Sequence, residues 1–258
     1  MARADSRVLS FGVVPQQSAV ELAKGWIPLL QLVAQRAQVG LRFVTATDIP
    51  TFERRLLAGE YDMAYMNPYH YTVFSQKPGY QAFAKEKGRR LRGLVVVRKE
   101  SPLRAMADLS GHEIVFPAPA AFAATVLVRA ELARQNVPVT ARFVNSHESV
   151  YLNVARGLFP AGGGIERTFQ AMDASVRDQL RVVWRTRDYT PHALAAHPRV
   201  PAAAVTAVRN AMLGLDGDAD GRNALQGITF NGVDVATDAE WADVRSLGIQ
   251  TLAELLRA

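Results

Sequence analysis

One short stretch of the chain gathers side chains that could contact a small ligand. It holds four of the seven tyrosines together with an asparagine and a histidine: Tyr61, Tyr65, Asn67, Tyr69, His70 and Tyr71. Phenol, amide and imidazole groups donate and accept hydrogen bonds, and the rings offer flat apolar surfaces. A buried strand followed by a packed helix is the alternative interpretation, because aromatic residues usually serve cores. We take Tyr65, Asn67 and Tyr69 as candidate ligand-binding residues.

Motifs for catalysis and for metal binding are incomplete. The sequence has no GxxxxGK[ST] phosphate loop, no HExxH and no GxSxG. It also has no cysteine, which excludes thiolate nucleophiles and cysteine-ligated metals. The acidic run 216–221 matches part of a calcium loop, but Gly227 stands where the bidentate glutamate belongs. An interhelical turn with an aspartate N-cap is preferred, calcium stays an open alternative, and we expect no catalytic residue, cofactor or metal.

The charge balance does not by itself define a partner. Lys and Arg number 30 against 24 Asp and Glu, a net charge of +6, but the basic residues are scattered. The one dense cluster, 85–92, reads as a solvated turn, and we expect no nucleic-acid partner. No apolar run reaches membrane-spanning length, and residues 1–7 lack the apolar region of a signal peptide. The chain is therefore either cytoplasmic or without its leader.

Short apolar strands alternate with helical stretches, the pattern of an α/β protein. The expected strands are 8–14, 41–45, 63–66, 93–97, 113–116, 141–144 and 181–184. A capping box formed by Ser18 and Glu21 begins the first helix, and a short helix is expected at 252–256. Three glycines, 162–164, indicate a tight turn. Two α/β units joined by extended segments near residues 95 and 185 predict two lobes with a cleft between them.

The cleft is expected at one edge of each sheet. Ligands of open parallel sheets bind beyond the carboxyl ends of the strands. This rule brings together the loops 15–18, 45–48, 65–71, 117–122, 145–148 and 160–164.

Several stretches, in order along residues 8–190, resemble one family. They are FGVVPQQS at 11–18 with Trp26 and Pro28, TATD at 45–48, GEYDMAY at 59–65 with Pro68, Ser101-Pro102, DLSG at 108–111, and Ser146-His147 followed by Gly157. The sequence resembles the phosphate-, phosphite- and phosphonate-binding branch of the type II periplasmic binding proteins of ABC transporters. The resemblance implies a two-lobed α/β fold with a central ligand cleft, no catalysis, and delivery of the ligand to a membrane permease.

The sequence departs from that family where a phosphoryl oxyanion would be held. The family usually carries a serine/threonine run at a helix start, whereas residues 118–124 read APAAFAA and only Thr125 is polar. The resemblance carries over to Tyr65, Ser146 and His147, but the hydroxyl groups of the run are lost. We therefore expect phosphate and simple alkylphosphonates to bind weakly.

The predicted ligand-binding residues come from both lobes. They are Gln17, Ser18, Tyr65, Asn67, Tyr69, Phe122, Thr125, Ser146, His147 and Gly163. His147 and Tyr65 are expected to face the ligand from opposite lobes, with Phe122 as an apolar wall beside them. The alternative for His147 is a structural histidine bonded to neighbouring backbone.

The predicted function is an extracytoplasmic solute-binding receptor for a small ligand, with an anion among the candidates, that hands its ligand to an ABC-type permease. The first lobe is predicted to comprise residues 1–97 and 184–258, and the second lobe to be the insertion 98–183. A ligand-sensing module with a membrane partner is the alternative, and a small-molecule enzyme is less favoured. We expect a monomer in the periplasm whose leader has been removed.

Overall fold

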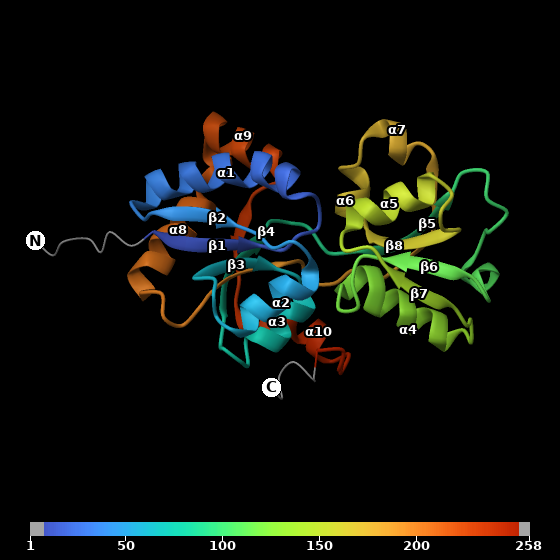
Figure 1. Cartoon of the computed structure of the whole chain (residues 1–258). Coiled ribbons are helices and arrows are strands. Elements are labelled where there is room, and N and C mark those ends of the chain that lie inside the picture. Colours follow the sequence, from blue (N-terminus) through green and yellow to red (C-terminus); the bar gives the residue numbers. More distant parts are fainter. Residues whose placement is uncertain (1–7, 253–258) are drawn as a thin grey trace, which may run out of the picture.

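Two lobes, each built on its own sheet, make up the computed structural model, which describes residues 8–252 (Figure 1). The first lobe has a six-stranded sheet of order β11-β4-β10-β3-β1-β2. Its strands are β1 (Leu9–Val13), β2 (Leu41–Val44), β3 (Met63–Met66), β4 (Gln81–Glu86), β10 (Ala193–Ala196) and β11 (Val233–Val235). β1 pairs in parallel with β2 and β3, whereas β10 runs antiparallel to β3 and β4.

Helices cover both faces of the first sheet. Above it in Figure 1 lie α1 (Ala19–Ala37) and α9 (Ala219–Gly227), and below it lie α2 (Ile49–Leu57), α3 (Pro68–Phe74) and α10 (Ala242–Arg245). Helix α8 (Ala202–Leu213) packs against α1. Helix α1 buries Leu22, Trp26 and Val33 at helical spacing, which explains its place on the sheet. None of the helices within residues 8–252 combines the length and the apolar character that a membrane span requires.

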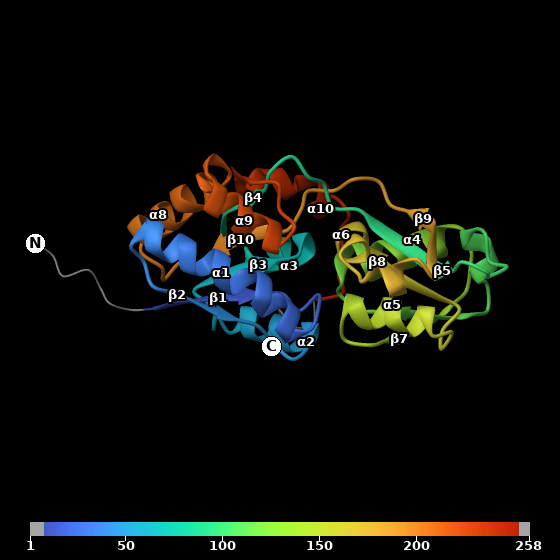
Figure 2. The same cartoon turned by 90° about the horizontal axis from the view of Figure 1, so that it is seen from above.

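The second lobe is built on a five-stranded sheet of order β7-β6-β8-β5-β9. Its strands are β5 (Gly93–Arg98), β6 (Glu113–Phe116), β7 (Thr140–Phe143), β8 (Ala161–Ile165) and β9 (Leu180–Arg185). Its helices are α4 (Leu127–Arg134), which continues a π-helical turn Phe122–Val126, and α5 (His147–Ala155), α6 (Glu166–Gln170) and α7 (Ala174–Arg177). Figure 2 shows the lobes side by side, joined by the segments that enter β5 and leave β9.

The lobe boundaries need a correction. The predicted borders at 97/98 and 183/184 fall inside β5 and β9, and both strands belong whole to the second sheet because they pair with each other. The chain crosses between lobes near an isolated bridge that pairs Leu91 with Tyr189. The inserted segment is therefore 93–185.

The glycine run does not form the predicted turn. Gly162, Gly163 and Gly164 lie in the buried strand β8. A Cβ at Gly163 would stand 2.1 Å from the carbonyl oxygen of Ala124. Gly163 therefore lets the backbone of the π-helical turn lie directly against the strand, whereas Gly162 and Gly164 leave room for the side chains of Val150 and Tyr151 on α5.

Two further local predictions were wrong. The cluster 85–92 is not wholly a solvated turn, since Lys85 and Glu86 end β4 and Glu86 is buried. The capping box is only half formed: the Ser18 hydroxyl accepts from the backbone N–H of Glu21 at 3.3 Å, but the side chain of Glu21 pairs with Lys24. The predicted helix at 252–256 extends beyond the described residues.

One hydrophobic core runs across the boundary between the lobes. The core of the first sheet includes, from the inserted segment, Ala118, Ala120–Ala124, Leu127 and Ile165. The second lobe has two cores of its own, one on each face of its sheet. The first lobe thus shares its core with the segment around Phe122, which closes the inner part of the boundary with apolar side chains.

Candidate functional site

The inner cleft lies where strand ends of the first lobe meet the start of α5 in the second. β1 ends at Val13 and leads to Gln16, while β3 ends at Met66 and leads to Asn67. His192 precedes β10, whose first residue pairs with Met66. The antiparallel strand thus brings its amino end to the edge where the parallel strands carry their carboxyl ends.

At the bottom of this cleft is a small chamber between the lobes. Its lining is Val14, Gln16, Ile49, Asn67, Leu91, Ala121, Phe122, Ala123, His147, Ile165 and His192. The free volume is about 10 Å³, hardly enough for one water molecule. The closed chamber is therefore filled by its own side chains.

Two buried histidines face this chamber. The Gln16 amide Nε2 lies 2.7 Å from the Nε2 atom of His192, so the amide donates and that ring nitrogen accepts. Burial, reinforced by the Arg167 charge, holds the pKa of His192 well below its usual value. Burial also lowers the pKa of His147 to about 3. Both rings are neutral at physiological pH.

Several polar atoms around the cleft are buried without hydrogen-bond partners in the described part of the chain. They are the Nδ1 atom of His147, the hydroxyl of Tyr65 and the hydroxyl of Thr125. Such atoms are uncommon in folded proteins because losing water without a replacement costs about 1–3 kcal/mol each. Tyr65 is stacked on His192, with ring centroids 4.9 Å apart, and burial raises the pKa of its phenol.

Polar contacts connect the two lobes around the chamber. The backbone N–H of His147 donates to the Gln16 carbonyl at 3.1 Å. The N–H of Ser18, at the start of α1, donates to a Glu148 carboxylate oxygen at 3.0 Å. The amide of Asn67 donates to the Ala120 carbonyl at 3.4 Å. The first two bonds hold the starts of α1 and α5 against each other, and the third joins the start of α3 to the segment before the π-helical turn.

A buried ion pair closes the opposite side of the cleft. The guanidinium of Arg167, on α6, pairs with the carboxylate of Glu86, on β4, and Arg89 approaches the second oxygen of Glu86 at 3.3 Å. The same guanidinium lies 4.7 Å from the ring centre of Phe230, which is a cation–π distance. The positive charge of Arg167 is thus already compensated.

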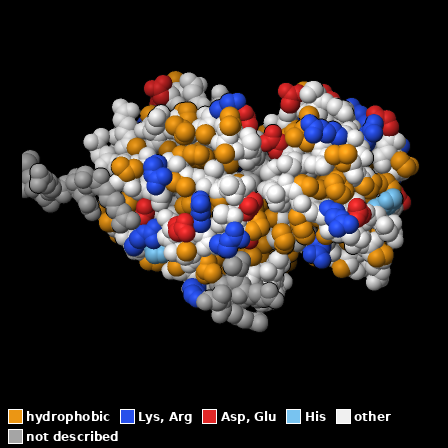
Figure 3. Space-filling model, in the orientation of Figure 1, with side chains coloured by type: hydrophobic (Ala, Val, Ile, Leu, Met, Phe, Trp, Pro, Cys, Tyr) orange, Lys and Arg blue, Asp and Glu red, His pale blue; other side chains and the backbone are white. Residues whose placement is uncertain are grey.

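Two outer chambers adjoin the inner one. A cavity of about 240 Å³ has Gln17, Glu21, Trp26, Tyr65, Arg167 and Thr229 among its lining residues. A cavity of about 410 Å³ has Glu86, Arg89, Arg90, Arg92, Arg167 and Asp188 in its walls. On the face seen in Figure 3, positive and negative side chains are mixed on both lobes and gather into no large patch of one sign. The charged groups surround the inner chamber but do not line it.

Five of the ten predicted site residues line the inner chamber or the cavity next to it: Gln17, Tyr65, Asn67, Phe122 and His147. The buried Nδ1 atom of His147 makes no hydrogen bond within residues 8–252, so this nitrogen is not bonded to neighbouring backbone there. Phe122 is 1% exposed and packs edge-on against Tyr189.

The other five lie elsewhere. The Tyr69 hydroxyl accepts from the backbone N–H of Leu252 at 2.9 Å and so faces the C-terminal segment. Ser18 and Ser146 cap helices α1 and α5. Thr125 is buried in the π-helical turn, and Gly163 lies inside β8. None of these five side chains lines the inner chamber.

The sequence reasoning missed Gln16 and His192. Gln16 stands beside the predicted Gln17, and a one-residue error in a loop changes which side chain points inward. His192 was missed because the strand-end rule considers only parallel strands. The sequence did contain one signal: His192 directly precedes the short apolar run 193–196, which forms β10.

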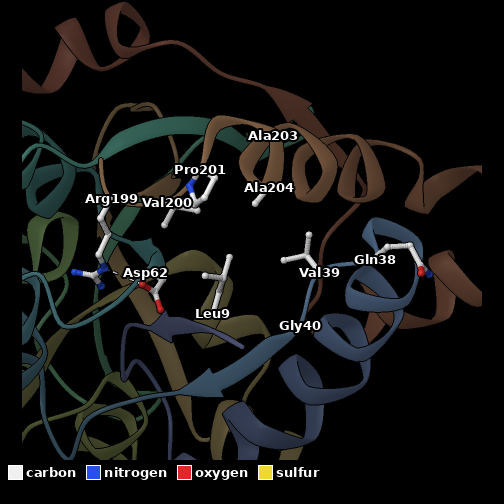
Figure 4. A pocket seen from close by; sticks show the side chains of 10 residues that line it. All are labelled: Leu9, Gln38, Val39, Gly40, Asp62, Arg199, Val200, Pro201, Ala203 and Ala204. Atoms are coloured by element: carbon white, nitrogen blue, oxygen red, sulfur yellow. Dashed lines mark hydrogen bonds and ion pairs between the residues drawn. The ribbon is translucent and has the colours of Figure 1, made fainter. Parts of the chain in front are cut away.

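A separate pocket of about 390 Å³ opens at the other edge of the first sheet (Figure 4). It lies beside Leu9, Gly40 and Asp62, near the amino ends of β1, β2 and β3. Asp62 accepts hydrogen bonds from Ser10 and pairs with Arg199 at 2.8 Å. Because ligands of such sheets bind at the carboxyl ends, this pocket is a weaker candidate than the cleft between the lobes.

Comparison with known proteins agrees with the two-lobed geometry. The family model described as "ABC transporter, phosphonate, periplasmic substrate-binding protein" matches residues 11–241. The chain belongs to this family. The family comprises binding proteins of transporters, and its fold is the α/β fold of the type II periplasmic binding proteins.

Individual relatives are distant in sequence. The phosphate-import protein PhnD of Mycolicibacterium smegmatis is 19% identical over 210 residues, which cover 69% of this chain and 62% of that protein. The chain thus aligns with less than two thirds of this relative's length. The binding-protein component of an ABC phosphonate transporter from Pseudomonas aeruginosa superposes with a TM-score of 0.87 at 16% identity, covering 96% of this chain and 87% of that one.

A third relative carries a ligand. PhnD1 from Prochlorococcus marinus in complex with methylphosphonate superposes with a TM-score of 0.86 at 15% identity, covering 98% of this chain and all (100%) of that one. At these identities the superpositions establish the shared fold of the substrate-binding family.

Proposed function

We propose that this protein is an extracytoplasmic solute receptor that binds a small molecule between its lobes and delivers it to an ABC-type permease. The supporting observation is the inner chamber, where Gln16, Asn67, His147 and His192 converge from both lobes. The buried Nδ1 atom of His147 has no hydrogen-bond partner within residues 8–252, so it can form a hydrogen bond with a ligand. In this proposal the protein works as a monomer in the periplasm, catalyses no reaction and binds no nucleic acid.

In the proposed receptor, the two lobes close around the bound ligand. The first lobe, up to about residue 92 and again from about 186, and the inserted lobe 93–185 move about the crossing segments near the Leu91–Tyr189 bridge. A ligand favours the closed state only to the extent that it contacts that state better than the open one. His147 and Asn67 come from different lobes, so a molecule that touches both supplies this difference.

Native mass spectrometry of the freshly purified protein tests the proposal. We expect one small molecule bound per chain, lost after unfolding and refolding. Gln16→Leu, which removes a chamber amide, should abolish the bound mass, whereas Tyr69→Phe, outside the chamber, should keep it. A wild-type protein without any bound mass, or a Gln16→Leu variant that retains it, would refute binding in this cleft.

A further inference from the structure

We infer that the inner chamber selects an uncharged solute with an apolar body, which replaces the ring of Phe122, and that Phe122 is the residue that determines this specificity. The inference rests on the proposed receptor function and adds the chemical class of the ligand. It follows from what fills the chamber, from the charge state of its walls, and from the groups that occupy the places where an anion would bind.

Phe122 is one of the residues that line the inner chamber between the lobes. Its side chain is 1% exposed, lines the chamber and packs edge-on against Tyr189 with ring centroids 5.3 Å apart. With about 10 Å³ free, the closed chamber has no room for a ligand of even a few atoms beside this ring. A ligand that displaces a phenyl ring from an apolar enclosure must restore the apolar contacts that the ring gave up.

The chamber walls carry no charge to match an anion. In the described part of the chain its polar lining consists of the neutral amides of Gln16 and Asn67 and the imidazoles of His147 and His192. Burial opposes protonation of both imidazoles, so neither supplies a positive charge near neutral pH. An unpaired charge enclosed here would lose its hydration without compensation.

Two nearby groups that could attract an anion already have partners. The guanidinium of Arg167 faces the outer cavities and pairs with the buried carboxylate of Glu86. The amino end of α1 is a favourable place for an anion, but Glu148 of the other lobe puts its own carboxylate on the Ser18 N–H. This carboxylate would also repel an entering anion.

The chamber still offers selective polar contacts. The buried Nδ1 of His147 is unsatisfied within residues 8–252. The amide nitrogen of Asn67 lies 3.0 Å from the His70 ring nitrogen, and its second contact, to the Ala120 carbonyl, is a long 3.4 Å. One hydroxyl or amide on an apolar body could bond to such groups. The chamber thus matches a ring-sized solute with one or two uncharged polar atoms.

The Phe122→Ala variant gives this chamber the space of a phenyl ring and allows defined probes to be used. The probes are phenol, toluene and methylphosphonate, each titrated into the full chain while the melting temperature and the heat of binding are measured. We expect phenol to bind Phe122→Ala at least as tightly as toluene, because the polar lining accepts its hydroxyl. Methylphosphonate should shift the melting temperature of neither this variant nor the wild type.

Phe116→Ala is the matched control, since Phe116 is fully buried in an apolar core of the second lobe. A cavity without polar lining should prefer toluene over phenol by about tenfold, because the hydroxyl is buried there without a partner. The same toluene preference in Phe122→Ala, or no binding of either probe, would overturn the inferred ligand class. Tight binding of methylphosphonate to the wild type would also overturn it while leaving the receptor function intact, which native mass spectrometry tests separately.

Discussion

His147 places a neutral imidazole inside the protein, and this has a consequence for the pH dependence of stability. Its pKa falls from an ordinary 6.5 to about 3 on folding, and burial lowers the pKa of His192 in the same direction. The unfolded chain therefore binds more protons below pH 6.5, so folding stability is lost as the pH falls through that value. Each such histidine contributes a slope of up to about 1.4 kcal/mol per pH unit.

We expect His147→Gln to reduce the loss of unfolding free energy between pH 7 and pH 5, because glutamine cannot take up a proton. Urea denaturation at several pH values measures this slope. His112→Gln is the control, since that histidine is exposed in the folded protein. Equal slopes for His147→Gln and wild type would mean that the His147 ring is accessible to protons in the folded state.

The buried hydroxyl of Tyr65 gives a second prediction, about the unfolding free energy. This hydroxyl finds no hydrogen-bond partner among the described residues, so Tyr65→Phe should leave the unfolding free energy unchanged or raise it by up to about 1 kcal/mol. The matched variant Tyr80→Phe should lower it by about 1–2 kcal/mol, because the Tyr80 hydroxyl donates to the Tyr61 carbonyl at 2.7 Å. A similar loss in both variants, measured by urea denaturation, would show that the Tyr65 hydroxyl has a partner in the native state.

Helices α1 and α5 meet at their amino ends across the cleft, and we expect their contact to limit how far the lobes separate. Glu148, in the first turn of α5, accepts from the Ser18 N–H at the start of α1. We expect Glu148→Ala to shift the unliganded protein toward more open conformations. Glu113→Ala should not do so, because Glu113 pairs with Arg142 within the second sheet.

Spin labels can measure this opening, because the chain has no native cysteine to react with the label. The exposed residues Val20, on α1, and Ala174, on α7, serve as labelling sites after replacement by cysteine. Pulsed electron paramagnetic resonance measures the distance between the two labels. The distribution of this distance should be longer or broader for Glu148→Ala than for Glu113→Ala. Identical distributions would mean that the Glu148 contact does not hold the lobes together.

Across the whole molecule, the sequence predicted the α/β class and the family, because strand and helix patterns are local and the family motifs lie in order. It did not predict that β5 and β9 pair with each other, since pairing between strands far apart in sequence leaves no local pattern. In the acidic run 216–221, Asp218 is the N-cap of α9: its carboxylate accepts from the Gly221 N–H at 2.8 Å. This confirms the predicted aspartate N-cap.

The site was harder to predict than the fold. Phe122, His147, Asn67 and Tyr65 were predicted to lie at the cleft because they follow strands or family motifs, and they line the inner chamber or the cavity next to it. His192 depends on an antiparallel strand, and the direction of a strand within a sheet is set by long-range pairing. Tyr69 was misplaced because its helix α3 turns it toward the C-terminal segment instead of the cleft.

We propose that this protein keeps the fold of a phosphonate-binding family but has lost the means to hold a phosphoryl group. Calorimetric titration of the purified wild-type protein with methylphosphonate tests it most directly. Losing two charge-assisted hydrogen bonds costs about 3–6 kcal/mol, which is roughly two to four decades of affinity. Applied to a dissociation constant of about 1 μM, this loss predicts weak binding, with a dissociation constant between about 0.1 and 10 mM. A sub-micromolar dissociation constant would contradict the claim and would mean that backbone amides alone hold the ligand.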